Sequence, residues 1–444
     1  MKKRSRSFSR QKDAPRKTPA RSAVPAQLVK IEKPIYGGAS LARVEGKAVF
    51  VPLALPGEEA RVRIVEEKRG YATAEVEEIV VAAPDRVVPK CKHFGTCGGC
   101  QYQHADYKAQ LGMKQAILRE TLERGGVHAP DEIVVLAGEP WAYRNRIRLA
   151  FDAEGRPGYR GRRSHTVVAI EECPIAAPAL VEAAFSAAEL FRKFAVPSRP
   201  AELSLFCDAD EESMLASVFT NGVARVPLTD YFGAISSEIS SLRGVELVEV
   251  HQGQSRTVAR TGAESIAYRA AGFAYRVDHG AFFQVNRWLV DKLVECVTDG
   301  LHGAVAWDLF AGVGLFARKL AGRFERVIAV ESASASIAAL TENLRSTNAT
   351  ALSATTLEFL RGAAKSACPD VIVVDPPRTG LGQETTELLG QIGAPELVYV
   401  SCDPATLARD LRVLVGAVYR IERLTLADLF PQTFHLETVV QLRR

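Results

Sequence analysis

The chain has 444 residues, of which 47% are hydrophobic and 24% charged, and these values exclude a wholly disordered or collagen-like protein. Its length predicts two to four domains. No apolar run reaches the ~18 residues that span a bilayer, and the N-terminus lacks the apolar core of a secretory signal. We therefore expect a soluble cytoplasmic protein with no membrane partner.

Residues 1–26 form a basic tail. They carry nine Lys or Arg and one acid, a net charge of +8, whereas the whole chain carries +4, so residues 27–444 sum to −4. The tail is rich in Ser, Pro and Ala and nearly free of aliphatic side chains, so we expect it to be disordered. Such an arm binds polyanions such as RNA without sequence specificity. A solubilising tail and a transit peptide are the alternatives.

Residues 27–83 show five short strands separated by turns that contain Gly or Pro. Five strands in so short a stretch are typical of a small β-barrel of the OB type. Two features resemble the TRAM domain, a small RNA-binding barrel: Gly37-Gly38-Ala39, and Val51-Pro52 followed by Pro56-Gly57-Glu58. The expected strands are Gln27–Lys33, Leu41–Val44, Lys47–Val51, Glu59–Glu67 and Tyr71–Val80.

Residues 84–270 mix helix and strand and form the expected central α+β domain. Tyr107–Arg124 has helical periodicity and ends at two glycines, which are a stop signal. Beyond it, Arg144, Arg146 and Arg148 alternate along a strand and therefore project from one face. This arginine ribbon favours contact with phosphates, and a solvated hairpin is the alternative. The remaining members of the ribbon are Arg156, Arg160, Arg162 and Arg163.

Four of the eight cysteines form a spaced group, Cys91-x5-Cys97-x2-Cys100 and the distant Cys173. Three thiols within ten residues can surround one metal centre, and a distant cysteine followed by proline is typical of ferredoxin-like sites. Zinc sites usually take two closely spaced pairs. The spacing therefore favours an iron–sulfur cluster over a structural zinc. The other cysteines away from the strand ends are expected in the core: Cys207, Cys296 and Cys368.

From residue 271 to 444 strands and helices alternate, which indicates an α/β domain with a doubly wound, Rossmann-like parallel sheet. Ligands of such sheets bind at the C-terminal ends of the strands. The expected strands are Ala304–Asp308, Arg326–Glu331, Asp370–Asp375 and Leu397–Ser401. The expected helices include Phe316–Ala321, Ser334–Thr347 and Pro404–Val415.

The first of these strand ends carries a glycine loop, in which Gly312 and Gly314 allow a tight turn and a close approach to a ligand. Glu331 ends the next strand, where an acid hydrogen-bonds ribose hydroxyls. Ala317 stands where a dinucleotide fingerprint has its third glycine. The loop therefore favours S-adenosylmethionine over NAD, with a purely structural turn as the alternative.

Three more candidates lie at the following strand ends. Asp375 precedes two prolines, and Arg378 stands where enzymes that methylate amines carry an aromatic residue. Cys402 precedes a helix whose N-terminal dipole is expected to lower the thiol pKa, as suits a nucleophile. Glu437 precedes the last strand and suits a general base. The structural alternatives are a helix cap, a buried thiol and a rim charge.

These parts suit methylation of uracil at C5. A thiolate that attacks C6 makes C5 reactive toward a methyl donor, and a base must then remove the C5 proton so that the thiolate can leave. Cys402, the Gly312–Gly314 loop and Glu437 supply these three parts. Asp375 is placed to hydrogen-bond the N3–H of the uracil.

Five motifs recur together in one known family. They are Phe282-Phe283-Gln284-Val285-Asn286, Asp308-Leu309-Phe310-x-Gly312-x-Gly314, Asp375-Pro376-Pro377-Arg378-x-Gly380, Ser401-Cys402-x-Pro404-x-Thr406-Leu407-x-Arg409-Asp410 and Phe430-Pro431-Gln432-Thr433-x-His435-x-Glu437. Over roughly residues 27–444 the chain resembles the RNA (uracil-5-)-methyltransferase family, most closely its bacterial 23S ribosomal RNA branch.

The resemblance implies that Cys402 is the nucleophile and Glu437 the base. It implies that the cofactor and uracil site is lined by Gln284, Phe310, Glu331 and Asp375. It further implies a 23S ribosomal RNA substrate and a [4Fe–4S] cluster on Cys91, Cys97, Cys100 and Cys173.

Three alternatives stay open: a transfer RNA substrate, a binding protein on the same fold that has lost catalysis, and an RNA cytosine-C5 methyltransferase. The chain departs from the family pattern at Leu315 and at Asp403, where Asn is usual. Cytosine-C5 enzymes use two catalytic cysteines, and Cys368, seven residues before Asp375, does not match the second. We expect a monomer.

Overall fold

The structure is a computed structural model that describes residues 25–193, 200–221, 233, 235–363 and 368–444. The expected disorder of the basic tail concerns residues outside these ranges. The chain divides into two compact units, one comprising residues up to Lys33 together with Ala39–Ala83, the other Pro34–Gly38 with Pro84–Arg444. Among the described helices, none has the length and hydropathy needed to cross a bilayer.

The smaller unit is a closed five-stranded barrel in the order β1-β2-β3-β5-β4, which confirms the predicted OB-like barrel. Its core consists of small aliphatic side chains, such as Val29, Ala42 and Val62, because the interior of so small a barrel has room for little else. The strands are β1 (Gln27–Ile35), β2 (Ala39–Val44), β3 (Lys47–Pro52), β4 (Glu59–Glu67) and β5 (Tyr71–Val81).

The second unit contains a seven-stranded sheet in the order β13-β12-β11-β10-β7-β8-β9. Helix α2 (Pro178–Lys193) packs against one face of it, and the two share an aliphatic core. The strands are β7 (Arg146–Phe151), β8 (Pro157–Arg160), β9 (Val167–Ala169), β10 (Pro200–Cys207), β11 (Met214–Asn221), β12 (Leu242–His251) and β13 (Gln254–Gly262). Between this sheet and the next lies a hairpin of β14 (Ser265–Ala270) and β15 (Phe273–Asp278).

The same unit contains an eight-stranded sheet in the order β18-β17-β16-β19-β20-β22-β21-β6. Its first five strands are parallel and β22 runs antiparallel to β20, so the predicted doubly wound α/β sheet is confirmed. The strands are β6 (Val134–Leu136), β16 (Gly303–Leu309), β17 (Phe324–Glu331), β18 (Ala349–Ser353), β19 (Val371–Val374), β20 (Glu396–Ser401), β21 (Arg420–Ala427) and β22 (Glu437–Arg443).

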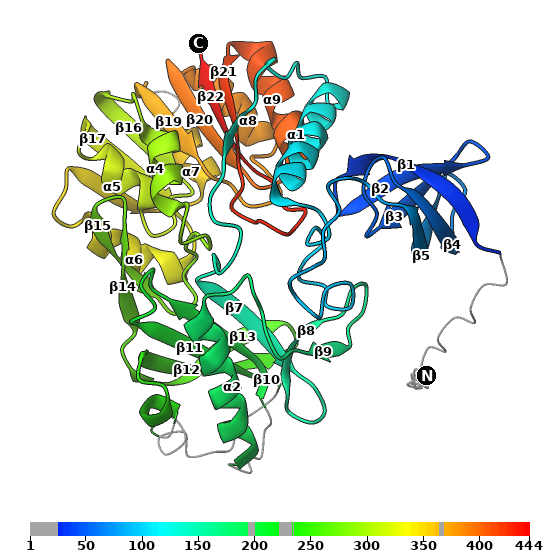
Figure 1. The fold of residues 1–444 in the computed structure, drawn as a ribbon. Coiled ribbons are helices and arrows are strands. Elements are labelled where there is room, and N and C mark those ends of the chain that lie inside the picture. The colour runs from blue at the N-terminus through cyan, green and yellow to red at the C-terminus, as the bar shows by residue number, and fades with distance from the viewer. Residues whose placement is uncertain (1–24, 194–199, 222–232, 234, 364–367) are drawn as a thin grey trace, which may run out of the picture. The chain divides into compact units, whose positions relative to one another are not determined.

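Helices cover both faces of this sheet (Figure 1). On one face α4 (Val290–Thr298), α5 (Leu315–Leu320) and α6 (Ser334–Leu344) bury aliphatic side chains against alternate strand residues such as Val371 and Val373. On the other face their neighbours Ile372 and Val374 pack with the remaining helices. These are α1 (Tyr107–Arg124), α7 (Thr356–Ala363), α8 (Gln383–Ile392) and α9 (Pro404–Ala417).

Two elements from the first third of the chain complete this layer. Strand β6 pairs in parallel with β21 at the sheet edge, and α1 packs against α9. Lys114 on α1 forms a fully buried ion pair with Asp428 at a distance of 2.5 Å. The eight-stranded sheet is therefore formed by residues that precede the seven-stranded sheet in the sequence together with residues that follow it. The preceding residues are those of β6, which lie within the expected central domain, residues 84–270.

Candidate functional site

The segments that carry the predicted chemistry meet at the C-terminal ends of neighbouring parallel strands in the eight-stranded sheet. The glycine loop follows β16, Glu331 ends β17, Asp375 follows β19 and Cys402 follows β20, and these strands are parallel neighbours. Glu437 opens the antiparallel strand β22, in which Thr438 lies opposite Ser401. The start of β22 and the end of β20 thus lie at the same edge, as ligand binding in such sheets requires.

The glycine loop turns sharply after β16. Phe310 and Gly312 have φ angles of 66° and 56°, and Gly314 has 90°. One carboxylate oxygen of Glu331 accepts from the Gly312 amide at 2.8 Å, and the other accepts from the Ser332 and Ala333 amides at 2.6 Å. The Glu331 side chain therefore connects the glycine loop to the end of β17 by hydrogen bonds.

Asp308 is a site residue whose role our sequence analysis missed. It is fully buried, and one carboxylate oxygen accepts from the Ala317 amide at 2.8 Å while the other has no hydrogen-bond partner. Burial raises the pKa of Asp308 to about 7. The sequence does contain a signal for this role, because Asp308 is an acid inside the apolar stretch Val305–Leu309. An acid in a buried strand rarely lacks a functional or structural role.

Cys402, Asp375 and Glu437 lie close enough together to alter one another's ionisation. Burial and the carboxylates of Glu437 and Asp375 raise the pKa of the Cys402 thiol to about 12, and Arg378 opposes this rise. Burial alone raises the pKa of Asp375 to about 7. Burial and then Asp375 raise the pKa of Glu437 well above its usual value. These effects favour the protonated forms of the Cys402 thiol and of the Asp375 and Glu437 carboxyl groups.

The expected lowering of the Cys402 pKa by the helix dipole is wrong. The side chain of Asp403 caps α9 and accepts from the Ala405 and Thr406 amides at 3.0 Å each. The amides that would have stabilised a thiolate are occupied by this carboxylate. Burial and two nearby acids then determine the state of the thiol.

The loop that leads to Glu437 is anchored by buried polar contacts. The Lys114 ammonium donates to Asp428 and to the Phe430 carbonyl at 2.9 Å. Arg378 lies 3.2 Å from Nδ1 of His435. Because burial and the nearby Arg378 lower the pKa of His435 to about 4, the neutral imidazole accepts from the guanidinium. This contact holds Arg378 beside the thiol and the carboxylates.

Tyr36 is a second neighbour that our sequence analysis missed. Its ring packs edge-on against Phe434 with the centroids 5.5 Å apart. Burial and then Asp403 raise its pKa to about 12, and Cys402 contributes to the rise. Tyr36 lies more than 360 residues before Cys402 in the chain, and no local pattern signals this proximity.

Gln284 lies on the segment between β15 and α4. It is buried, and its backbone carbonyl accepts from the Asn145 side chain at 2.9 Å. Two residues further on, Asn286 donates to the Leu429 carbonyl at 3.1 Å. These bonds connect the Gln284 segment with the loop that leads to Glu437.

Cys91, Cys97, Cys100 and Cys173 line one cavity, and all four are free thiols. The Gly99 amide donates to the Cys97 sulfur at 3.4 Å, and the Tyr159 hydroxyl lies 3.8 Å from the Cys173 sulfur. Within the described ranges, no group of three or more His, Cys, Asp or Glu is arranged to hold a metal ion. The donor set is nevertheless four thiols facing one space, which fits the ligand set of a cluster.

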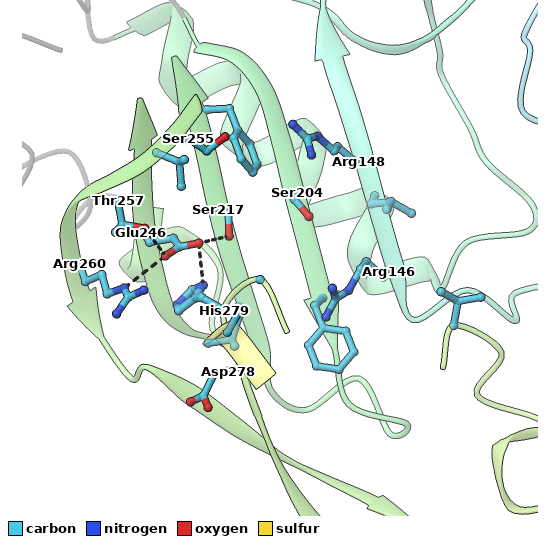
Figure 2. A pocket seen from close by; sticks show the side chains of 18 of the residues that line it. Arg146, Arg148, Ser204, Ser217, Glu246, Ser255, Thr257, Arg260, Asp278 and His279 are labelled. Carbon is cyan, nitrogen blue, oxygen red and sulfur yellow. Dashed lines mark hydrogen bonds and ion pairs between the residues drawn. The ribbon is translucent and has the colours of Figure 1, made fainter. Parts of the chain in front are cut away.

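The arginine ribbon divides into two parts. Arg146 and Arg148 line a pocket on the seven-stranded sheet, as their alternation predicted (Figure 2). Arg144 lines the same pocket and also the cavity of the four cysteines. Arg156 is paired with Asp152 at 2.8 Å and Arg160 with Glu202 at 3.1 Å. Arg148 of the first part also pairs with Glu202, at 2.6 Å, so neighbouring acids offset some of the charge in both parts.

Comparison with known proteins gives matches along most of the chain. A family model described as tRNA (Uracil-5-)-methyltransferase matches residues 261–444, and the TRAM domain model matches residues 26–76. The 23S rRNA (uracil(1939)-C(5))-methyltransferase RlmD of Halomonas elongata is 32% identical over 92% of this chain and 87% of the relative. An uncharacterized RNA methyltransferase of Streptomyces avermitilis is 35% identical over 93% of this chain and 97% of the relative.

A solved structure is similar over the same length. It is the crystal structure of Pyrococcus abyssi tRNA (uracil-54, C5)-methyltransferase in complex with S-adenosyl-L-homocysteine, with a TM-score of 0.76 and 25% identity. The match covers 94% of this chain and 100% of that one.

Proposed function

Since the chain belongs to the RNA (uracil-5-)-methyltransferase family, we propose that it methylates C5 of a uracil in 23S ribosomal RNA with S-adenosylmethionine as methyl donor. The observation that carries the proposal is the meeting of one thiol, Cys402, with Glu437 and Asp375 at the strand edge beside the glycine loop. This is the group set that C5 methylation needs, with a nucleophile, a base and a binding carboxylate next to a cofactor loop.

The cofactor would lie against the Phe310–Gly314 loop and Glu331, with Gln284 assigned to it by the family resemblance, and would supply the methyl group. The target uridine must first leave its RNA fold to reach the edge. Cys402, once deprotonated, forms a bond to C6, and the electron pair moved to C5 takes the methyl group. Glu437, which must be ionised for this step, then removes the C5 proton, the C5–C6 double bond re-forms, and the thiolate leaves. Asp375 accepts from N3–H and orients the ring.

The test is tritium release from RNA labelled at uracil C5, in the presence of S-adenosylmethionine. We expect release by the wild type, none by Cys402→Ala, and a stalled covalent RNA complex with Glu437→Gln. Cys368→Ala is the matched control, because Cys368 is exposed and precedes β19, at its opposite end from Asp375. Absence of release from unmodified ribosomal RNA would favour a binding protein on this fold.

A transfer RNA substrate is the second candidate. The solved relative carries that activity in its name at 25% identity, whereas the relatives named for 23S ribosomal RNA are 32% identical. Transcripts of both RNA classes, offered in separate reactions and then together, distinguish the two. We expect the protein to act as a monomer in the cytoplasm and to prefer the ribosomal transcript.

We further propose that Cys91, Cys97, Cys100 and Cys173 hold a [4Fe–4S] cluster. Support comes from the convergence of four thiols on one cavity and from the Gly99 amide directed at the Cys97 sulfur. A cluster here would fix the folded path of residues 91–100 against Cys173. Anaerobic reconstitution should give four irons and four sulfides per chain, with loss in Cys173→Ala and retention in Cys296→Ala. One zinc per chain in the purified protein would contradict the cluster.

A further inference from the structure

A pocket of about 650 Å³ lies on the seven-stranded sheet, on the face opposite α2 (Figure 2). Successive side chains of a strand point to opposite faces of the sheet. Ser204 and Phe206 of β10 therefore line the pocket, whereas Leu203 and Leu205 pack in the core with α2. Its volume lies within the range of small-ligand sites. Ser334 and Ala335, which follow shortly after Glu331, line the same pocket, so it opens beside the cofactor end of the eight-stranded sheet.

The Arg146 guanidinium in this pocket has no compensating acid. Its Nε is buried without a hydrogen-bond partner, and within the described residues it forms no ion pair. By contrast, Arg148 pairs with Glu202 at 2.6 Å and Arg260 pairs with Glu246 at 3.2 Å. Burial lowers the pKa of Arg146 to about 10, which still leaves it charged near neutral pH. A half-buried, uncompensated cation is costly unless an anion joins it.

Two arginines of the pocket lie over aromatic rings. The Arg146 guanidinium is 4.4 Å from the ring centroid of Phe206, and that of Arg148 is 4.1 Å from the ring centroid of Phe219. Guanidinium planes held this way are surfaces on which RNA bases stack. The pocket thus offers a stacking surface as well as a charge.

The opposite wall offers polar atoms. Glu246 accepts from Ser217 at 2.8 Å, from Thr257 at 3.3 Å and from Arg260. His279 is only 7% exposed; its Nδ1 lies 3.9 Å from Glu246, and its Nε2 has no partner. Burial lowers the pKa of His279, so the ring is neutral. His279 therefore forms part of the pocket wall as a neutral, buried ring beside the Glu246 carboxylate.

We propose that this pocket binds one unpaired nucleotide of the RNA substrate, distinct from the methylated uridine, with its phosphate on Arg146, its base against the arginine–phenylalanine stacks and His279 in the adjoining wall. The inference rests on the proposed function, because it assumes an RNA substrate that also reaches Cys402. It adds a second point of attachment, which would orient the RNA relative to the catalytic edge.

The first test uses the salt dependence of binding to a 23S transcript that the wild type methylates. Each lost phosphate contact lowers the slope of log K against log salt by about 0.7 for single strands. We expect Arg146→Met to show this loss and roughly tenfold weaker binding at low salt, with Arg146→Lys keeping the slope. Arg192→Met, on α2 behind the sheet, is the control. An unchanged slope in a folded Arg146→Met protein overturns the proposal.

The second test asks whether one nucleotide occupies the pocket. Abasic substitutions are placed singly around the target uridine, and wild type and His279→Ala are compared on each RNA. One position should weaken wild-type binding but not weaken His279→Ala further. Additive losses at every position contradict the proposal. If the wild type binds these RNAs but releases no C5 tritium, the proposed function fails independently of this pocket.

Discussion

At the scale of single residues, the candidate site collects acids whose burial favours the protonated form. Asp308 and Asp375 have pKa values raised to about 7, and the pKa of Glu437 is raised well above its usual range. The first cause in each case is burial, which penalises the charged form. Arg378 is the cation that lowers the pKa values of both Cys402 and Glu437. A reaction that begins with a thiolate therefore depends on this one arginine and on pH.

We predict that Arg378→Gln shifts the pH dependence of methylation toward higher pH. Removing the guanidinium raises the thiol pKa further, and one unit means about tenfold less thiolate at a given pH below the pKa. Single-turnover rates should be about tenfold lower than those of the wild type at every pH between 6 and 9, because this whole range lies below the thiol pKa of both proteins. Arg378→Lys, which keeps the charge, should resemble the wild type. Coincident profiles for Gln and wild type would refute the role given to Arg378.

We predict a pH-dependent stabilisation by Asp308→Asn. The folded-state pKa of about 7 lies above the unfolded value of about 3.9. The stabilising effect of the neutral carboxyl is complete below the unfolded pKa and is lost as pH rises through 7. Asn stays neutral and can still accept from Ala317. The melting-temperature advantage of the variant should therefore grow from pH 5 to pH 8, whereas Asp299→Asn, 83% exposed, should show no such trend.

At the scale of elements, α1 acts as a clamp on the loop between β21 and β22. Lys114 contacts Asp428 and Phe430, and Gln110 exchanges two hydrogen bonds with Gln432 at 2.9 and 3.0 Å. Gln432 has a φ of 67°, a conformation that a non-glycine residue adopts only when its surroundings hold it. The helix thereby fixes the approach of the chain to Glu437.

We predict that Lys114→Met destabilises the protein by about 3–5 kcal/mol, because it leaves the Asp428 carboxylate buried without its partner. Chemical denaturation monitored by fluorescence measures the loss. Lys108→Met, at an exposed position of the same helix, is the matched control. A double variant, Lys114→Met with Asp428→Leu, should recover part of the loss. Equal midpoints for Lys114→Met and Lys108→Met would contradict the clamp.

Local signals explain which elements were predictable. The bounds of α1 agree with the prediction because Asp106 caps its start and Gly125 ends it, and both signals lie beside the helix in sequence. The parallel strands were likewise readable from short aliphatic runs that end in polar residues. Strand β6 was not predicted, because three residues carry no periodicity and its pairing with β21 is long-range.

The candidate site shows the same limit. Sequence motifs identified the strand ends that carry Cys402, Asp375 and Glu437, since polar residues at these positions are visible in one dimension. The direction of the thiol pKa was mispredicted, because burial and neighbouring charges are properties of the packed edge. Tyr36 and the pocket around Arg146 and His279 depend on contacts between distant segments. The sequence therefore identified the candidate residues at the strand ends, but not the burial and the neighbouring charges that set their pKa values.

At the scale of the whole molecule, charge is divided between the tail and the rest. The first 26 residues carry +8 and residues 27–444 carry −4, so the positive balance of the chain resides in those first 26 residues. The overall charge of residues 27–444 does not favour RNA, so the contact proposed for Arg146 depends on local charge.

We predict that replacing the nine basic residues of the tail with Gln slows RNA association and lowers the salt slope, while the single-turnover rate at saturating RNA stays the same. Long-range attraction depends on net charge, which the replacement changes to −5 because Asp13 remains. Stopped-flow binding at several salt concentrations measures the effect. A tail of the same length with Lys and Arg interchanged should behave as the wild type, and an unchanged association rate would assign the tail no role in RNA capture.

The pairing of α1 and β6 with the end of the chain has a consequence for biosynthesis. Lys114 and its partner Asp428 are 314 residues apart. At about 5–20 residues per second, a ribosome needs roughly 15–60 seconds to make the intervening chain. During that interval the segment that forms the seven-stranded sheet emerges, while α1 still lacks α9 and the loop after β21, against which it packs in the folded protein. The nascent chain therefore exposes the apolar face of α1 to chaperones until α9, β21 and β22 have been made and can pack with it.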